Sequence, residues 1–313
     1  MNECSIFVAG PTAVGKSAIA LRLAKKINGE IISVDSMQVY RGLDIGTAKS
    51  SPQERGEIPH HLIDVVDLNE SFDAAQFCRL AEKAVIDIQA RNRIPIFCGG
   101  TGFYFKAFLE GLGEAPPSNE TIRVELKKKS WPDLLEELKQ LDPTTFEKID
   151  RQNPRRVIRA LEVIHLTGKP FSEQRADWRG SETGERKSEV RPRMSGFFFG
   201  LAREDLRDRI NLRVEKMFQR GLVAETEELL KRGLAKNNTA MQAIGYRQVV
   251  EHLRGQRSLP ETKELVKIKT RQFAKRQMTW FRRQAKLEWI NIGEKENESS
   301  VADRLVKEMT TKV

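Results

Sequence analysis

The feature of this sequence that most restricts its fold is the stretch GPTAVGKS at residues 10–17. It matches the pattern G-x-x-x-x-G-K-[ST], in which a glycine-rich loop joins a buried strand to a helix. The apolar segment CSIFVA precedes the loop, and Ile19, Leu23 and Ile27 follow it at helical spacing. Strand, loop and helix therefore occur in the order that such a loop requires.

A loop of this kind binds phosphate. Its backbone N–H groups converge on phosphate oxygens at the positive end of the helix, and Lys16 adds a full positive charge. The Ser17 hydroxyl can coordinate Mg²⁺, which is the cofactor that we expect. A glycine turn that only connected strand and helix would leave Lys16 and Ser17 unexplained. The predicted phosphate-binding residues are Gly10, Pro11, Thr12, Ala13, Val14, Gly15, Lys16 and Ser17.

The order of the remaining segments predicts an α/β fold. Strand-like segments at 30–36 (EIISVDS), 60–66 (HHLIDVV) and 94–100 (IPIFCGG) alternate with helical patterns. Strands that alternate with helices form a parallel sheet with right-handed crossovers, and its ligands gather at the carboxyl ends of the strands. We therefore predict a P-loop NTPase-like parallel sheet flanked by helices, with Asp35 and the GGTG segment at the ligand edge.

A second region interrupts this pattern. TIRVELKKK, WPDLLEELKQL and NPRRVIRALEVIHLTG have helical character and are separated by Pro and Gly, and a polar run at 179–193 predicts a mobile loop. Strand character then returns at GFFFGLA, and the chain beyond it is mostly helical. We predict a helical insertion at 116–195, lodged in a core formed by residues 1–115 and 196–313.

Composition restricts the function classes. The chain has 54 Lys and Arg against 44 Asp and Glu, and the net charge of +10 favours a polyanionic partner, although excess Lys can be a solvated surface. Cys4, Cys78 and Cys98 form no C-x-x-C pair, so neither a disulfide nor a zinc site is predicted. We expect a cytoplasmic protein with no membrane partner, because no secretory leader or long apolar run is seen.

The strand IPIFC ends unusually for an ATPase. A P-loop ATPase commonly carries an Asp at this point to order Mg²⁺ and the attacking water, whereas here Gly99, Gly100, Thr101 and Gly102 follow. Asp64 or Asp67 could supply the carboxylate, so ATP hydrolysis is disfavoured but stays open. Glycine lets a backbone approach a ligand closely, and Thr101 can donate a hydrogen bond to phosphate. This segment suits a diphosphate leaving group.

The stretch DSMQVYRGLDIGTAK at 35–49 supplies the other candidate groups. Asp35 ends the second strand, where a general base would face the phosphate loop, and Gln38 could pair with an adenine edge. An Asp that caps the next turn is the alternative, and for an isolated Asp it would be favoured. The neighbouring motifs favour the base.

Taken together, these segments resemble the tRNA dimethylallyltransferase (tRNA isopentenyltransferase) family in its bacterial form. GPTAVGKS, DSMQVYRGLDIGTAK, PHHLIDV, GGTGFY, NPRRVIRALEV and AIGYRQ occur in that family's order over nearly the whole chain. The pair DSMQVYRGLDIGTAK and GGTGFY is the specific part, since many NTPases share a P-loop. No Cys or His cluster follows the core, so the zinc-finger extension of some eukaryotic members is missing.

The resemblance implies transfer of a dimethylallyl group from dimethylallyl diphosphate to N6 of the adenosine at tRNA position 37, 3′ of the anticodon, with release of diphosphate. Asp35 would be the base, Thr101 would contact the diphosphate, and Lys16 with Ser17-bound Mg²⁺ would neutralise it. Arg209 resembles the family's diphosphate-binding arginine. The implied partners are the tRNA anticodon stem-loop and dimethylallyl diphosphate, we expect a monomer, and the loop could also bind ATP. The resemblance also implies that the helical insertion at 116–195 contacts tRNA.

Recognition of tRNA is expected along a helix that starts at Pro154. Arg155 and Arg159 lie one turn apart on one face, while Val157 belongs to the apolar face, and an amphipathic surface helix is the alternative. With the resemblance, the expected tRNA contacts are Asp35, Ser36, Met37, Gln38, Thr101, Arg123, Arg155, Arg156, Val157, Ile158, Arg159, Gln242, Gly245, Tyr246 and Arg247. Trp280 and Phe281 are predicted to be core residues.

Three other functions compete with this one. A small-molecule P-loop kinase would consume ATP, and the GGTG strand end and the helical insertion argue against it. An adenylate isopentenyltransferase would use a free nucleotide, whereas the arginines of the insertion favour RNA. A nucleic-acid-dependent NTPase or binding module fits the charge but lacks a convincing hydrolytic carboxylate.

Overall fold

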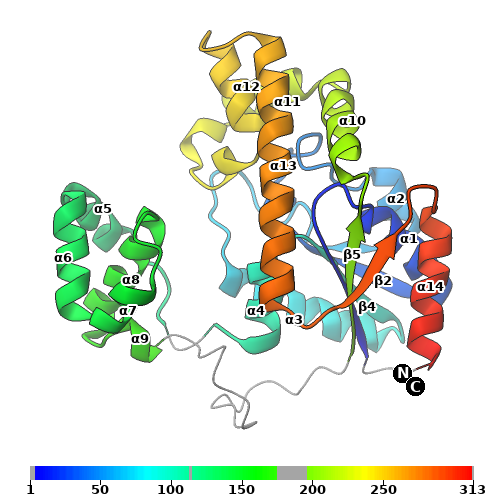
Figure 1. Ribbon diagram of the computed structural model, residues 1–313, viewed down its shortest axis with the longest axis horizontal. Helices are drawn as coiled ribbons and strands as arrows, with labels where there is room; N and C mark the ends of the chain where they lie inside the picture. The colour runs from blue at the N-terminus through cyan, green and yellow to red at the C-terminus, as the bar shows by residue number, and fades with distance from the viewer. Residues whose placement is uncertain (1–3, 113–114, 175–195, 312–313) are drawn as a thin grey trace. The chain divides into compact units, whose positions relative to one another are not determined.

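The computed structural model describes residues 4–112, 115–174 and 196–311 (Figure 1). Contacts divide the chain into two compact units, one made of residues 1–109 and 191–313 and the other of residues 110–190. The sequence-based division set the corresponding boundaries at 115/116 and 195/196. The loop predicted at 179–193 lies outside the described residues.

The first unit is built on a parallel sheet. Within the described residues six strands pair in the order β3-β2-β4-β1-β5-β6, and every pair is parallel. The strands are β1 (Ser5–Ala9), β2 (Gly29–Val34), β3 (His60–His61), β4 (Ile94–Gly99), β5 (Gly196–Arg203) and β6 (Glu288–Ile292). The predicted α/β class is confirmed, and β4 lies directly beside β1.

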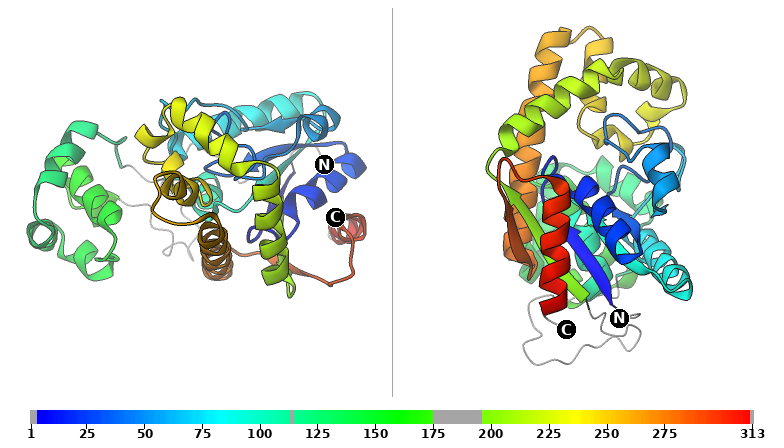
Figure 2. Two further views of the ribbon diagram at one scale, coloured as in Figure 1. Left: turned by 90° about the horizontal axis from the view of Figure 1, so that it is seen from above. Right: turned by 90° about the vertical axis from the view of Figure 1, so that its right-hand side faces the viewer.

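Helices cover both faces of this sheet (Figures 1 and 2). In sequence order, the helices of this unit are α1 (Lys16–Ile27), α2 (Pro52–Glu57), α3 (Ala74–Ala90), α4 (Gly102–Glu110), α10 (Leu206–Gln219), α11 (Leu222–Lys231), α12 (Tyr246–Leu253), α13 (Leu259–Gln284) and α14 (Glu298–Thr311), of which α11 and α12 pack on neighbouring helices. The short 3-10 turns η1 (Leu234–Lys236) and η2 (Ala240–Gln242) join α11 to α12.

The side chains of β1 alternate between the two faces of the sheet and contribute to an apolar core on each face. Ile6 and Val8 belong to an apolar cluster with residues of α1 and α14, which lie side by side (Figure 2). Phe7 points the other way and stacks between Phe97 and Phe198, at centroid distances of 4.7 and 4.5 Å. Because successive side chains of a strand face opposite ways, five buried residues serve both layers.

Helix α13 is 26 residues long and begins with a capping box. The Ser258 hydroxyl accepts from the Glu261 backbone N–H, and the Glu261 carboxylate accepts from Ser258, which satisfies donors that a helix start leaves unpaired. The helix packs against α10 and α12. Neither α13 nor any other described helix has the length and apolar character needed to cross a membrane.

The second unit is a small helical bundle. It contains α5 (Glu120–Lys128), α6 (Trp131–Leu141), α7 (Pro143–Lys148), α8 (Pro154–Thr167) and α9 (Phe171–Gln174). Leu126, Leu138, Val157 and Leu161 form its core. Side chains of Asn119, Ser130 and Asp142 cap α5, α6 and α7, so the Pro and Gly breaks in the sequence correspond to helix ends.

Candidate functional site

The loop between β1 and α1 has the backbone of a phosphate-binding turn. Gly10, Ala13 and Gly15 have φ angles of 152°, 66° and 106°, which glycine adopts readily and Ala13 adopts at a cost. Helix α1 begins at Lys16, so the loop N–H groups sit at its N-terminus. The Lys16 ammonium donates to the Pro11 carbonyl at 2.7 Å, which holds its charge over the loop.

Lys16 is partly buried, and its charge is poorly solvated. Burial is the main cause that lowers the pKa of Lys16 to about 8, and the nearby Arg213 acts in the same direction, while Cys98 and Asp35 oppose the shift. The structure thus brings Lys16 and Asp35 together at the carboxyl edge of the sheet, as the sequence predicts. A bound phosphate anion would favour the protonated form of Lys16.

Two arginines of α10 lie at this site. Arg209 donates from Nε to the Ala13 carbonyl at 3.1 Å, so it contacts the phosphate loop itself. Arg213, one turn later, reaches the Thr47 carbonyl at 3.5 Å, and burial lowers its pKa while Asp35 raises it. Of these two arginines, only Arg209 was predicted from the sequence. Arg213 was available in the same LRDRINLR segment, since residues four apart share a helix face.

Thr101 lies next to the phosphate loop because β4 is paired with β1. Its hydroxyl accepts a hydrogen bond from the Ser36 N–H at 3.2 Å, and its own N–H donates to the Val34 carbonyl at 3.2 Å. A hydroxyl that accepts one bond still has its proton to donate. Thr101 therefore joins the end of β4 to the start of the loop that carries Asp35 and retains a donor for a ligand oxygen.

The two oxygens of the Asp35 carboxylate differ in their hydrogen bonding. Oδ1 accepts from the N–H groups of Met37 and Gln38 at 2.8 and 3.2 Å, which is the capping alternative considered from the sequence. Within the part of the chain that the structure describes, Oδ2 has no hydrogen-bond partner. The backbone bonds orient the carboxylate and leave one oxygen able to accept a proton.

Gln38 is committed to the protein. Its Oε1 accepts from the Ser33 hydroxyl at 2.9 Å and its Nε2 donates to the Thr47 carbonyl at 3.2 Å. Pairing with an adenine edge would require both bonds to break. In this structure Gln38 connects β2 to the loop at 35–49, and its predicted contact with an adenine edge stays a prediction.

A buried lysine holds the same loop. Lys49 donates to the Tyr40 carbonyl at 2.9 Å and to carboxylates of Asp44 and Asp64 at 2.5 and 2.6 Å. Asp64 also accepts from Arg55 at 2.7 Å, and Asp67 pairs with Arg41 at 3.2 Å. Both carboxylates that could have supported ATP hydrolysis are thus engaged in ion pairs.

Tyr246 supports the loop from α12. Its buried hydroxyl donates to Glu225 at 2.6 Å and accepts from the Gly46 N–H at 3.1 Å, and Glu225 also accepts from the Ile45 N–H. Burial raises the pKa of Tyr246. A Cβ at Gly46 would lie 2.4 Å from the Tyr246 ring. The Tyr246 side chain is buried and supports the loop from inside the protein, and the predicted contact of this residue with tRNA stays a prediction.

The neighbours of Tyr246 differ in exposure. Arg247 is exposed and pairs with Glu251 at 3.1 Å. Gln242 donates to the Asn238 carbonyl at 2.6 Å, and Gly245 precedes α12 with a φ of 103°. Arg247 is the group of this segment whose charge faces solvent, and its predicted tRNA contact stays a prediction.

In the second unit, two predicted tRNA contacts hold a buried carboxylate. Glu162 is 0 % exposed and accepts from Arg159 at 2.7 Å, from Arg123 at 2.9 Å and from the Asn119 N–H at 2.6 Å. Burial alone would raise the pKa of Glu162, but these hydrogen bonds hold it below its usual value. Arg159 also donates to the Pro116 carbonyl at 2.5 Å. Arg123 and Arg159 are therefore parts of the bundle as well as candidate RNA contacts.

The other predicted tRNA contacts on α8 lie on two different faces of that helix. Val157 is buried in the bundle and Ile158 packs against it, and their predicted contact with tRNA stays a prediction. Arg155 and Arg156 are exposed on the outer side.

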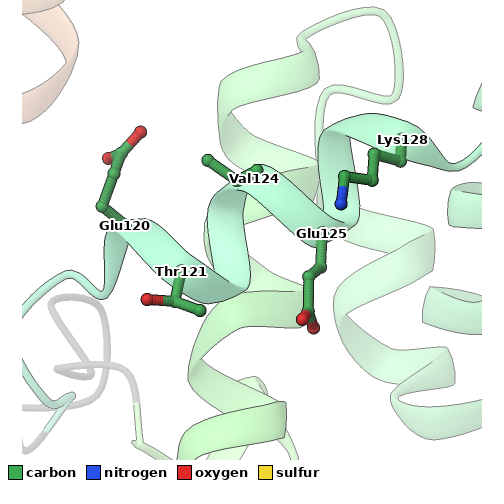
Figure 3. Close-up of a pocket in the computed structure, with 5 residues that line it drawn as sticks. All are labelled: Glu120, Thr121, Val124, Glu125 and Lys128. Atoms are coloured by element: carbon green, nitrogen blue, oxygen red, sulfur yellow. The ribbon is translucent and has the colours of Figure 1, made fainter.

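A shallow pocket on α5 contains none of the predicted residues (Figure 3). It is lined by Glu120, Thr121, Val124, Glu125 and Lys128.

The phosphate loop of β1 and α1, the adjacent Thr101 segment and Asp35 define a P-loop-type α/β protein whose strand beside the loop ends without a carboxylate. The family model described as IPP transferase matches residues 38–284, and the chain belongs to that family. The resemblance found in the sequence is confirmed.

Curated relatives extend over nearly the whole chain. The tRNA dimethylallyltransferase of Carboxydothermus hydrogenoformans is 42% identical over 315 residues, covering 98% of both chains. The protein of the same name from Anoxybacillus flavithermus is 41% identical, covering 99% of this chain and 96% of its own.

Solved structures show the same fold. The tRNA isopentenylpyrophosphate transferase of Bacillus halodurans has a TM-score of 0.69 and 37% identity, covering 99% of this chain and 98% of that one. A eukaryotic dimethylallyltransferase described as acting on tRNA has a TM-score of 0.78 and 28% identity, covering 98% of this chain and 79% of that one.

Proposed function

We propose that this protein transfers a dimethylallyl group from dimethylallyl diphosphate to N6 of adenosine 37 of tRNA and releases diphosphate. The observation that carries the proposal is the grouping of Lys16, Asp35 and Arg213, from three separate segments, at one edge of the sheet. Membership of the IPP transferase family supports the assignment of substrates.

The donor end of the site is cationic. Loop N–H groups, Lys16 and Arg213 would hold the diphosphate, and Thr101 would donate its hydroxyl proton to a phosphate oxygen. As the allylic C–O bond breaks, negative charge grows on the departing diphosphate, and donors that are already in place stabilise it. We assign this role to Arg213 in addition to Arg209, because Arg209 is bonded to the loop carbonyl of Ala13.

The acceptor end requires a base. The N6 lone pair of adenine is delocalised into its ring, so loss of an N6 proton as the C–N bond forms favours the reaction. Asp35 Oδ2 would take that proton, while Oδ1 stays bonded to the backbone N–H groups that orient it. The allyl group moves from diphosphate oxygen to nitrogen, and no oxidant or reductant is needed.

The residues fit a Mg²⁺ ion carried with the donor. Ser17 is exposed in the first turn of α1, and its hydroxyl makes no hydrogen bond to any described residue. One protein oxygen beside diphosphate oxygens is a donor set that suits Mg²⁺, which often keeps most of its ligands from substrate and water. Ser17 would hold the ion, which when bound supplies neutralising charge. Binding of ATP in the loop belongs to the same proposal, since loop amides recognise phosphate.

We assign tRNA as the acceptor substrate because the protein carries positive charge that would attract a polyanion. The chain carries a net charge of +10, and Arg155, Arg156 and Arg247 present exposed side chains. The target base must leave its stack to bring N6 to Asp35, which costs on the order of a few kcal/mol that backbone contacts offset. We also propose a monomer that acts in the cytoplasm on the anticodon stem-loop.

One reaction mixture tests the proposal. Protein is incubated with labelled dimethylallyl diphosphate, ATP, Mg²⁺ and either unmodified tRNA or AMP, and both labelled acceptor and ATP hydrolysis are followed. Labelled tRNA with intact ATP is the expected result, and Lys16→Ala should abolish labelling. Labelled AMP without labelled tRNA would identify an adenylate transferase. Lys16-dependent ATP hydrolysis without prenylated adenine would overturn the proposal.

A further inference from the structure

Gln277 of α13 bridges the two loops of the donor site. Its Oε1 accepts from the Thr12 N–H of the phosphate loop at 2.8 Å, and its Nε2 donates to the Gly100 carbonyl at 2.9 Å. The side chain is 8% exposed. One amide therefore satisfies a donor in one loop and an acceptor in the other, and it links segments that are 265 and 177 residues away in the chain.

The glycines on either side of Thr101 make room for α13. A Cβ at Gly100 would lie 2.2 Å from Gln277 Nε2, and a Cβ at Gly102 would lie 2.1 Å from a ring carbon of Trp280. From the sequence, these glycines were expected to allow close approach of a ligand. The structure instead places α13 side chains against both, one turn apart on the helix, so the backbone around Thr101 is held from one side.

An amide suits this position because it has a donor and an acceptor on one planar group. An apolar side chain of the same size would leave the Thr12 N–H and the Gly100 carbonyl without their partner in a largely buried place, which destabilises the arrangement. A carboxylate could accept from Thr12 but would repel the Gly100 carbonyl. Gln277 therefore meets the need for a hydrogen-bond donor and a hydrogen-bond acceptor on the same side chain.

We propose that Gln277 is a positioning residue that sets the spacing between the phosphate loop and Thr101, so that both can bind one diphosphate. The inference rests on the proposed function, because it assigns the two loops to the same diphosphate. Gln277 acts through Thr12 and Gly100 and does not itself touch the reacting atoms. The same contacts would lower the cost of ordering the two loops when the donor binds.

The first test replaces the amide by an apolar side chain of similar length, Gln277→Met, with Gln272→Met as a matched control at an exposed site of α13. Binding of inorganic diphosphate and of dimethylallyl diphosphate is measured by calorimetry. We expect Kd for both to rise by roughly tenfold to a hundredfold, the size that two lost hydrogen bonds predict. The Kd of Gln277→Met for tRNA, and every Kd of the Gln272→Met control, should stay within about twofold of the unmodified protein. A general loss of structure in Gln277→Met would instead weaken its binding of diphosphate, dimethylallyl diphosphate and tRNA alike.

The second test uses Gln277→Glu and pH. When protonated, the carboxyl offers a carbonyl to Thr12 and an O–H to Gly100, as the amide does; when ionised it loses the donor. Burial raises the pKa of such a carboxyl, so diphosphate affinity relative to the unmodified protein should recover as pH falls from 8 to 5.5. Gln277→Met should show no recovery.

The outcomes separate this inference from the proposed function. Near-normal diphosphate binding by Gln277→Met would overturn the inference alone, as would a Gln277→Glu protein that gains no affinity at low pH. If the unmodified protein binds no diphosphate, the proposed function fails and the inference with it. Should Gln277→Met not fold, the pH comparison within Gln277→Glu decides.

Discussion

Arg159 and Arg156 lie on the same helix, α8, and we expect opposite consequences when each is replaced by Ala. Arg159 donates to Glu162, which is 0 % exposed, and to the Pro116 carbonyl. Arg156 is exposed at the outer side of the helix. Arg159→Ala should therefore destabilise the bundle, and Arg156→Ala should weaken tRNA binding with no change in stability.

The loss of stability expected for Arg159→Ala depends on the hydrogen-bond partners that Glu162 retains in that variant. Removal of one partner from a buried ion pair costs about 3–5 kcal/mol, because the other charge stays buried without compensation. Here Arg123 and the Asn119 N–H still bond to Glu162, and the Arg159 side chain is itself 29% exposed. We therefore expect Arg159→Ala to lower the free energy of unfolding of the bundle by about 1–3 kcal/mol.

Hydrogen–deuterium exchange of α8 measures this change, with α3 of the other unit as the internal reference. Salt titrations of tRNA binding provide the second measurement, in which loss of one phosphate contact in Arg156→Ala should reduce the slope by roughly 0.7. If Arg159→Ala left exchange in α8 unchanged and reduced the salt slope as Arg156→Ala does, Arg159 would be an RNA contact and not a support for Glu162.

Three further predictions concern the donor site. Asp35→Ala should reduce transfer by ~10²–10⁴ with tRNA affinity within a few-fold, as measured by single-turnover rates and filter binding. Donor affinity should be full below the Lys16 pKa of about 8 and fall as pH rises through it, by roughly tenfold between pH 7 and 9, whereas Lys16→Arg should remove this dependence. Arg213→Gln should reduce kcat by ~10²–10³, and Arg209→Gln should mainly raise the donor KM.

The local part of the fold could be predicted from sequence. GPTAVGKS implied a strand, a loop and a helix, and the structure has β1 ending at Ala9 and α1 starting at Lys16. The spacing of Val157 and Leu161 already assigned them to an apolar face, and both are buried. The contact of Val157 with RNA rests on the family resemblance alone and stays a prediction.

Partners that are distant in the chain could not be predicted. The Gln277 amide reaches Thr12 across 265 residues, and nothing in the pattern RQFAKRQMTW separates a bridging Gln from a solvated one. Tyr246 is equally ambiguous, because a tyrosine can face RNA or hold a buried loop. Only the packing of α12 against α11 and the loop at Gly46 decides between these roles.

Because β4 lies beside β1, the lack of a carboxylate at the end of β4 affects the chemistry that the phosphate loop can support. Where a hydrolytic enzyme orders a water molecule with Asp, this chain has glycines covered by Gln277 and Trp280, with Thr101 between them. Asp64 is tied to Lys49 and cannot replace the absent group without breaking a buried ion pair. Asp35 is the carboxylate whose charge acts on Lys16, and under the proposed function it would serve as the base that activates an incoming amine. Under the proposed function, the phosphate loop that serves hydrolysis in other proteins would here hold a diphosphate until a nitrogen nucleophile displaces it.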